Sequence, residues 1–365
     1  MFLIVTRNFP PDIGGMQILM GGLSENLLNH GPVKVFTYEY KGSNIYDNKS
    51  SINIERIKGI KLFRKYRKAN SVNDFIKESS NIRAIIADHW KSLELLKIER
   101  LQKSKTFCLL HSKEINHSVG SSLNKRLIKS TNKADFIIAN SNFTRDLAVK
   151  VGIDSSKIHI IFPGIPKPKA IQNISKIEAE KIFGESFPKI ITVARFDKRK
   201  GHDKILMLIK NLKPKFPKIK YISVGSGEEE NNLVKLSKEL SLEKEVTFLK
   251  NINEDLKLAL IAVSNLFLMP SRIEKNSVEG FGISFIEAAS YGVASIGGKD
   301  GGASDAITHN KTGLICNGED LNSIYDSVID LFKNEKFIIY GKNAKNFSEN
   351  FHWNKVVKKY LKLIN

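Results

Sequence analysis

The sequence has 365 residues, 41% of them hydrophobic and 26% charged, which are the proportions of a globular protein long enough for two domains. This composition excludes a disordered, collagen-like or coiled-coil chain, and two distant cysteines, Cys108 and Cys316, exclude a disulfide framework and a cysteine zinc site. The net charge of +20 is compatible with nucleic acid, an anionic membrane surface or a phosphorylated substrate as a partner.

Short apolar runs alternate with helical patterns along the whole chain. Candidate strands lie at residues 2–6, 33–37, 84–87, 106–110, 136–139 and 158–162, then at 189–193, 220–224, 246–249, 266–269, 294–296 and 313–315. Helical patterns lie between strands, for example at 16–29, 204–212, 229–240 and 321–333. Continuous runs of Ile, Val, Leu and Phe are typical of strands buried on both faces of a parallel sheet. The alternation therefore predicts an α/β protein with doubly wound sheets.

The alternation breaks once, between Phe162 and Lys169, where three prolines and a glycine indicate a linker. We expect two Rossmann-like domains of similar size, residues 1–165 and 166–347, that face each other across a cleft. Ligands of open α/β sheets bind outside the carboxyl ends of the strands, so we expect the chemistry there.

The first residues predict a buried strand instead of a signal segment. No stretch approaches the roughly 20 apolar residues of a membrane helix, so we expect a cytoplasmic protein. Between Arg56 and Lys68 there are seven basic residues and no acidic one, interleaved with Ile60, Leu62, Phe63 and Tyr66. This segment is either a solvated face or a patch that attaches the protein peripherally to an anionic membrane.

Two carboxylates, Glu279 and Glu287, lie eight positions apart around a glycine-rich turn. The first precedes the turn Gly280-Phe281-Gly282, and the second lies inside the helix that follows from Ile283. Backbone N–H groups at the start of that helix favour phosphate or developing negative charge. The alternative is a plain glycine-rich loop with two surface glutamates.

Three further features follow candidate strands. Arg195 and Lys200 follow the strand 189–193 and suit a diphosphate, although a basic surface loop would look the same. Gly14 and Gly15 follow the first strand, where they allow close backbone approach to a ligand or simply form a turn. His111 follows the strand 106–110, and a lone histidine is either catalytic or structural.

Taken in chain order, these motifs resemble a family 4 glycosyltransferase of the GT-B fold over nearly the whole chain. The matching segments are Ala134–Arg145, Phe162–Gly164, Val224–Gly227, Pro270–Ser271, Glu279–Gly282, Glu287–Ala289, Gly292–Val293, Gly301–Asp305, Lys311–Gly313 and Phe351–Trp353. The resemblance implies an acceptor-side N-terminal domain, completed by a C-terminal helix at about residues 348–365, and a C-terminal domain that binds a nucleotide sugar.

The resemblance also implies roles for single residues. Arg195 and Lys200 correspond to the pair that binds the donor diphosphate, Glu279 lies beside the transferred sugar, and Glu287 holds the ribose. Gly14 and Gly15 correspond to the N-terminal glycine loop, and His111 contacts the sugar near its anomeric carbon.

On this basis His111 and Glu279 are the expected catalytic residues. The turn of Gly280, Phe281, Gly282 and Ile283 completes the expected donor site. Members of this kind retain anomeric configuration, so we expect a retaining transfer with no metal and no cofactor other than the nucleotide-sugar co-substrate.

Two departures concern the donor. Ala294-Ser295 replaces the usual Pro-Val, and Lys250 stands where a glycine commonly lies near the nucleotide base. Both leave the donor open between UDP- and GDP-linked sugars.

The motif pattern leans toward the branch that contains phosphatidylinositol mannosyltransferases, and the segment 56–68 favours a lipid-linked or cell-envelope acceptor. Another GT-B activity such as nucleotide-sugar epimerisation, or transfer to a small soluble acceptor, stays open. A basic nucleic-acid-binding protein is a more distant alternative, because the basic residues are spread over both halves without an RNA-binding or helix-turn-helix signature.

Overall fold

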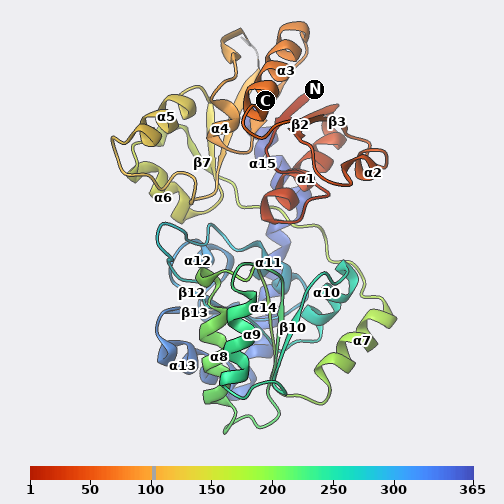
Figure 1. Cartoon of the computed structure of the whole chain (residues 1–365), viewed down its shortest axis with the longest axis vertical. Coiled ribbons are helices and arrows are strands. Elements are labelled where there is room, and N and C mark those ends of the chain that lie inside the picture. Colours follow the sequence, from red (N-terminus) through yellow and green to blue (C-terminus); the bar gives the residue numbers. More distant parts are fainter. Residues whose placement is uncertain (101–103) are drawn as a thin grey trace. The chain divides into compact units, whose positions relative to one another are not determined.

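The computed structural model in Figure 1 describes residues 1–100 and 104–365. The chain divides into an N-terminal unit, Met1–Pro166 with Phe351–Asn365, and a C-terminal unit, Lys167–Asn350. The first contains a seven-stranded parallel sheet of order β3-β2-β1-β4-β5-β6-β7, and the second a six-stranded parallel sheet of order β10-β9-β8-β11-β12-β13. The predicted pair of Rossmann-like α/β domains is confirmed.

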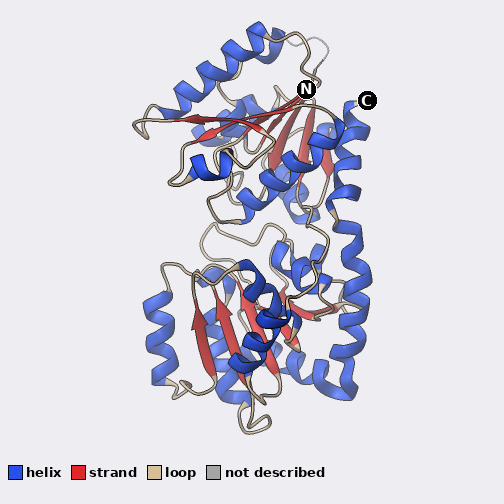
Figure 2. Cartoon of the chain, turned by 90° about the vertical axis from the view of Figure 1, so that its right-hand side faces the viewer, coloured by secondary structure: helices blue, strands red, loops and turns tan. Residues whose placement is uncertain are grey.

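In the N-terminal unit, helices cover both faces of the sheet (Figures 1 and 2). The strands are β1 (Phe2–Val5), β2 (Val33–Tyr38), β3 (Asn53–Ile57), β4 (Ala84–Ala87), β5 (Lys105–Leu110), β6 (Phe136–Ala139) and β7 (Ile158–Ile160). The α-helices are α1 (Gly15–Leu27), α2 (Ser43–Asp47), α3 (Arg64–Glu78), α4 (Trp90–Leu93), α5 (Ser122–Thr131), α6 (Asn142–Lys150) and α15 (Trp353–Ile364). Alternate residues of β1 enter two separate cores: Leu3 and Val5 pack in the core of α3 and α5, and Phe2 and Ile4 in that of α1 and α15.

Strand β3 lies at the edge of this sheet and was not among the predicted strands, because it is not a continuous apolar run. Its sequence, NIERI, alternates polar and apolar residues, and only Ile57 is fully buried. The side chain of Arg56 is 7% exposed, and its Nη2 lies 2.7 Å from Asp47 Oδ1. Arg56 therefore ties the sheet edge to α2, and its inclusion in a surface patch was wrong.

The C-terminal helix α15 belongs to the N-terminal unit. Trp353 is buried against two glycines, Gly22 in α1 and Gly164 after β7, and a Cβ atom at either glycine would lie 2.4 Å from the indole. Just before the helix, the backbone N–H of Ile165 donates to Phe351 O at 2.8 Å. Side-chain volume at Trp353 and its absence at the glycines together fix the place of α15.

The C-terminal unit has the same doubly wound pattern. Its strands are β8 (Lys189–Val193), β9 (Lys220–Val224), β10 (Val246–Leu249), β11 (Leu266–Met269), β12 (Ser295–Gly298) and β13 (Gly313–Cys316). Its α-helices are α7 (Asn173–Phe183), α8 (His202–Leu212), α9 (Glu230–Glu239), α10 (Glu254–Ala262), α11 (Ile283–Ser290), α12 (Ala303–Ala306), α13 (Leu321–Phe332) and α14 (Lys336–Ser348). On one face, Ile190 and Leu268 of the sheet pack with Leu206 of α8 and Val328 of α13.

Each sheet has one place where the direction of strand addition reverses. In the N-terminal unit this switch point lies between β1 and β4, and in the C-terminal unit between β8 and β11. Ligands of open α/β sheets bind outside the carboxyl ends of the strands at such a point. Both switch points carry polar residues that the hydrophobic core does not require.

Candidate functional site

The switch point of the C-terminal unit carries the basic turn that follows β8. Asp197 caps this turn by accepting a hydrogen bond from Arg199 N at 3.1 Å. Arg272 N, which comes after β11, donates to Arg199 O at 2.9 Å and joins the turn to the neighbouring strand end. These bonds place the cations of the turn at the carboxyl edge of the sheet.

Glu279 and Lys200, predicted from separate motifs, form one buried ion pair. The Lys200 ammonium contacts Glu279 Oε2, and Arg199 Nη1 lies 2.9 Å from the same oxygen. The Glu279 side chain is only 11% exposed. Arg199 was not predicted as a site residue, and its only sequence signal was membership of the same basic cluster.

Two cations face this one carboxylate. Burial alone would raise the pKa of the Glu279 carboxyl, but Lys200 and Arg199 outweigh burial and lower that pKa to about 2. Burial lowers the pKa of the Lys200 ammonium, although Glu279 beside it acts in the opposite direction. Because two cations stabilise one carboxylate, we treat the whole cluster as ionised at neutral pH.

Arg195 lies at the start of the turn and its side chain is exposed. Its carbonyl oxygen lies 3.1 Å from Nε2 of the buried His202 ring. Burial lowers the pKa of His202 to about 4, so the ring is neutral and donates from Nε2 while Nδ1 faces Ser223 Oγ at 3.1 Å. His202 therefore fixes the backbone of Arg195 and leaves its guanidinium outside.

Glu287 lies on α11 and pairs with Lys257 of α10. The Lys257 ammonium is 2.8 Å from Glu287 Oε1 and 2.8 Å from Glu254 Oε1, and these two carboxylates raise its pKa even though burial acts to lower it. Glu287 Oε2 has no hydrogen-bond partner within the described parts of the chain. One oxygen is thus held in place while the other is available to a ligand.

The glycine-rich turn between the two glutamates requires its glycines. Gly282 has φ of 88° and precedes α11, and a Cβ atom there would lie 2.5 Å from the Phe285 ring. Gly302 N donates to Glu279 O at 2.9 Å, so the Gly301-Gly302 segment supports the turn from behind. The Phe281 side chain is buried, so Gly280, Phe281, Gly282 and Ile283 offer mainly backbone to a ligand at the start of α11.

The remaining predicted residues, Gly14, Gly15 and His111, lie in the N-terminal unit. Helix α1 begins at Gly15, where a Cβ atom would meet nothing within 4 Å, whereas a Cβ atom at Gly14 would overlap the side chain of Gln17. His111 follows β5, and its Nε2 lies 3.0 Å from Asp88 O, at the end of the adjacent strand β4.

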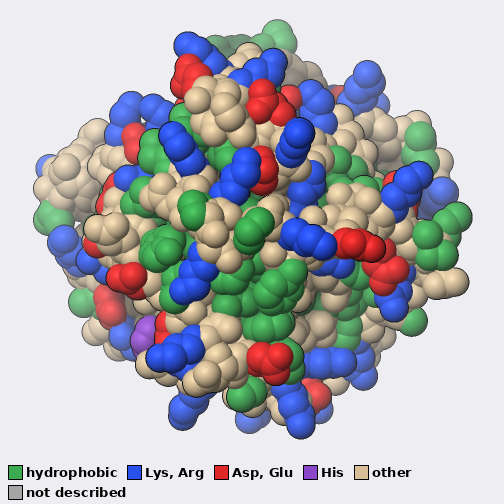
Figure 3. Space-filling model, turned by 90° about the horizontal axis from the view of Figure 1, so that it is seen from below, with side chains coloured by type: hydrophobic (Ala, Val, Ile, Leu, Met, Phe, Trp, Pro, Cys, Tyr) green, Lys and Arg blue, Asp and Glu red, His purple; other side chains and the backbone are tan. Residues whose placement is uncertain are grey.

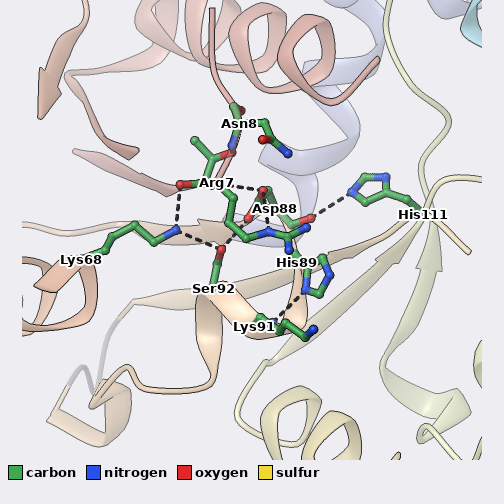
Figure 4. A network of polar contacts seen from close by, with 9 residues as sticks. Arg7, Asn8, Lys68, Asp88, His89, Lys91, Ser92 and His111 are labelled. Atoms are coloured by element: carbon green, nitrogen blue, oxygen red, sulfur yellow. Dashed lines mark hydrogen bonds and ion pairs between the residues drawn. The ribbon is translucent and has the colours of Figure 1, made fainter. Parts of the chain in front are cut away.

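Asp88 is the centre of a polar network that the sequence did not predict (Figure 4). Its carboxylate is fully buried and accepts hydrogen bonds from Arg7 N at 3.0 Å and Ser92 Oγ at 2.6 Å. The Lys68 ammonium donates to Thr6 O at 2.8 Å and to Ser92 Oγ at 3.3 Å. Burial lowers the pKa of Lys68 to about 8, and its position in the interior means that, like Arg56, it is no part of a surface patch.

The exposed part of the predicted basic patch is its middle, residues 58–67, in which only Arg64 is half-buried. We call these residues the β3–α3 segment. Ile60 is 70% and Leu62 72% exposed, and Phe63 and Tyr66 are about half exposed. Among the described residues no helix is both long enough and apolar enough to cross a bilayer. Nor do three or more His, Cys, Asp or Glu side chains among those residues form a group able to hold a metal ion.

Much of the positive charge lies outside these clusters. Figure 3 shows one face of the molecule, on which Lys and Arg side chains are scattered among acidic and apolar ones. On that face they do not form the continuous stripe that is typical of a nucleic-acid-binding surface.

Solved structures define the class of fold. HepE from Anabaena in complex with UDP matches with a TM-score of 0.83 at 17% identity, over 100% of this chain and 99% of that chain. Sucrose-phosphate synthase from Thermosynechococcus elongatus matches with a TM-score of 0.79 at 18% identity, over 99% and 97%. The two Rossmann-like units are those of the GT-B fold of glycosyltransferases.

Family models narrow the class. "Glycosyltransferase Family 4" matches residues 13–167, and "Glycosyl transferases group 1" matches residues 173–351. Together the two models cover most of both units, and the chain belongs to the family 4 glycosyltransferases, as its motifs predicted.

Two curated relatives show how varied the family is. The GDP-mannose-dependent alpha-(1-6)-phosphatidylinositol monomannoside mannosyltransferase of Mycobacterium tuberculosis is 26% identical over 353 residues, which cover 90% of this chain and 88% of the relative. The N-acetyl-alpha-D-glucosaminyl L-malate synthase of Bacillus anthracis is 30% identical over 191 residues, 52% of this chain and 48% of the relative.

Proposed function

We propose that the C-terminal unit binds a nucleotide-diphosphate sugar and that the enzyme transfers its hexose with retention of configuration and without a metal ion. The observation that carries the proposal is the ionised cluster of Glu279, Lys200 and Arg199 at the β8–β11 switch point, beside the exposed Arg195. A diphosphate carries enough negative charge to engage the cations of this cluster.

The chemistry follows from where charge develops. As the glycosidic bond to the donor phosphate breaks, negative charge accumulates on the diphosphate and the sugar becomes oxocarbenium-like. In this proposal Arg195, Lys200 and the start of α11 stabilise the leaving group, which is catalysis by preorganised charge. In the proposed mechanism the acceptor hydroxyl oxygen bonds to the anomeric carbon on the face from which the phosphate leaves, and the departing phosphate oxygen takes the hydroxyl proton. Bond breaking and bond formation on the same face give retention.

Glu279 and Glu287 take separate tasks in this proposal. Glu279 is ionised and buried beside the cations, so it suits the hydroxyls of the transferred sugar. Glu287 has one oxygen held by Lys257 and one without a protein partner, so it suits a ribose hydroxyl. His111, from the N-terminal unit, would contact the sugar near its anomeric carbon.

The donor is identified by a thermal-shift screen of UDP-, GDP- and ADP-sugars. The mycobacterial relative uses GDP-mannose, and the Anabaena structure holds UDP, so both bases belong in the panel. A ligand at a hundred times its Kd should stabilise the fold by about 2.7 kcal/mol. The product of the matching donor should have the donor's anomeric configuration by NMR, and no shift with any nucleotide sugar would contradict the proposal.

For the acceptor, we propose a lipid-linked or cell-envelope molecule reached by peripheral attachment at the cytoplasmic face of a membrane. The support is the β3–α3 segment, where exposed Ile60 and Leu62 alternate with exposed Lys58, Lys61 and Lys65. Apolar side chains among cations suit the interface of an anionic bilayer.

Sedimentation with vesicles tests this attachment. Wild type should bind vesicles with an anionic lipid more strongly than neutral ones, and Lys61→Glu with Lys65→Glu should abolish the difference. Lys235→Glu, an exposed lysine of α9, is the matched control and should change little. Equal binding by all variants would contradict peripheral attachment and favour a small soluble acceptor.

A further inference from the structure

Two hydrogen-bond donors without acceptors lie at the switch point of the N-terminal unit, at the ends of the adjacent strands β1 and β4 (Figure 4). They are the guanidinium of Arg7, just after β1, and the imidazole of His89, just after β4. The established family membership and the roles proposed above give neither residue a task.

Arg7 is held by its backbone and not by its side chain. Its N–H donates to Asp88 Oδ2 at 3.0 Å, but its Nε is 3.9 Å from the same oxygen, too far for a hydrogen bond. The Nε atom is shielded from solvent without a partner, while the side chain as a whole is 32% exposed. None of the five guanidinium N–H groups has a hydrogen-bond acceptor among residues 1–100 and 104–365.

His89 is 3% exposed and has a defined tautomer. Its Nδ1 accepts a hydrogen bond from Lys91 N at 2.9 Å, so the proton of the neutral ring is on Nε2. Burial, followed by the charge of Arg7, holds the pKa of His89 well below its usual range. The Nε2–H is therefore a neutral donor at physiological pH, and the described residues offer it no acceptor.

The neighbouring carboxylate does not satisfy these donors. Both oxygens of Asp88 are engaged, Oδ1 by Ser92 Oγ and Oδ2 by Arg7 N. Lys68 donates to Thr6 O and Ser92 Oγ and adds a buried cation to the partly exposed cation of Arg7. Two cations and one carboxylate leave the switch point with excess positive charge and unused donors. One of these donors, Arg7 Nε, is shielded from solvent, and leaving a buried donor without an acceptor costs free energy.

We propose that Arg7 and His89 bind an oxyanion, most suitably a phosphate, carried by the acceptor substrate. The planar fork of an arginine matches two phosphate oxygens, and the imidazole N–H supplies a further donor from the adjacent strand end. The inference rests on the proposed function in that the N-terminal unit is the acceptor side. It assigns to the acceptor an anionic group that the donor site of the C-terminal unit does not bind.

A matched set of small acceptor fragments tests the inference by calorimetry. Glycerol 3-phosphate should bind wild type more tightly than glycerate, and glycerol should show no binding. Arg7→Met should weaken the binding of glycerol 3-phosphate at least tenfold. Arg7→Lys, which keeps the charge but not the planar guanidinium, should weaken this binding less. Arg145→Met removes an exposed arginine of α6 that pairs with Asp146, and it should have no effect.

The donor site is controlled separately with Lys200→Met. If Lys200→Met lost the binding of glycerol 3-phosphate and Arg7→Met kept it, the phosphate would bind in the donor site and the inference would be overturned. Equal binding of glycerol and glycerol 3-phosphate, or no effect of Arg7→Met, would also overturn it. Titration of nucleoside diphosphates into the same variants separates the two proposals. If wild type binds the nucleotide but does not bind glycerol 3-phosphate through Arg7, this inference alone is refuted. If wild type binds no nucleotide, the proposed function is refuted.

Discussion

Lys257 holds Glu287, the residue proposed to contact the ribose of the donor. It lies between Glu254 and Glu287, and only the second of these carboxylates is assigned to the donor. Because its ammonium holds one oxygen of Glu287, the orientation of the other oxygen depends on it. Lys257 is therefore a positioning residue in the proposed mechanism.

We expect Lys257→Met to raise the KM for the donor by about tenfold or more with a smaller effect on kcat, since a hydrogen bond to a charged group is worth about 1.5–3 kcal/mol. Glu254→Gln removes the other, exposed partner of Lys257 and should leave KM nearly unchanged. A donor analogue without ribose hydroxyls should bind wild type and Lys257→Met equally. A persistent difference with that analogue would show that Lys257 acts on something other than the ribose.

At the same scale, Glu279, Lys200 and Glu287 were predicted because the motifs that contain them resemble those of family 4 glycosyltransferases. Arg199, Lys257 and Asp88 were not predicted. Their importance comes from contacts with residues 80, 30 and 81 positions away, and no local pattern reports such contacts.

Among the secondary-structure elements, α15 shows how a single side chain fixes a helix. Trp353 fills the space left by Gly22 and Gly164 and packs in the core that also contains Phe2 and Ile4. The helix is otherwise amphipathic, with Val356, Val357 and Tyr360 buried on one face.

Trp353→Ala should lower the free energy of unfolding of the N-terminal unit by about 3–5 kcal/mol, the usual cost of emptying a large aromatic site. Chemical denaturation followed by far-ultraviolet circular dichroism, which reports on the backbone, measures this loss. The control Ile338→Ala, at an exposed position of α14, should change stability by less than about 0.5 kcal/mol. A comparably small effect of Trp353→Ala would show that α15 contributes little to the unit.

The buried His202 of α8 gives the C-terminal unit a defined acid sensitivity. Its pKa is about 4 in the folded state, and its ordinary value is 6.5, so the unfolded chain binds more protons between these values. Stability from this group is complete above pH 6.5 and falls as the pH drops to about 4, by about 3 kcal/mol in all.

His202→Gln should remove this part of the pH dependence. Chemical denaturation at several pH values from 7 to 4 should show a steeper loss for wild type than for the variant. Parallel curves for the two proteins would contradict the assignment of His202 as a buried neutral ring.

At this scale most elements were predictable, because strands buried on both faces are continuous apolar runs. Predicted strands such as 136–139, 189–193 and 266–269 match the structure, whereas β3 was missed because its residues alternate at a sheet edge. That error also affected Arg56, which was counted as surface charge although it is bonded inside the fold.

For the whole molecule, the GT-B fold and the family followed from the order of motifs, each of which is short. The donor base and the acceptor did not follow, because a short motif does not report which side chains from separate strands lie together. Arg7 and His89 illustrate this: they are 82 positions apart and adjacent only because β1 pairs with β4. The net charge of +20 is likewise a property of the whole molecule, and it does not determine which kind of partner binds.

In the proposed enzyme the cluster of Glu279, Lys200 and Arg199 marks the nucleotide-sugar site. Calorimetric titration of the nucleoside diphosphate selected by the donor screen tests it most directly. Wild type should bind the nucleotide, and Lys200→Met should bind it at least tenfold more weakly. Because breaking a buried ion pair can cost about 3–5 kcal/mol of stability, circular dichroism checks that the variant is folded. Equal nucleotide affinity in wild type and a folded Lys200→Met protein would contradict the assignment of this cluster as the nucleotide-sugar site.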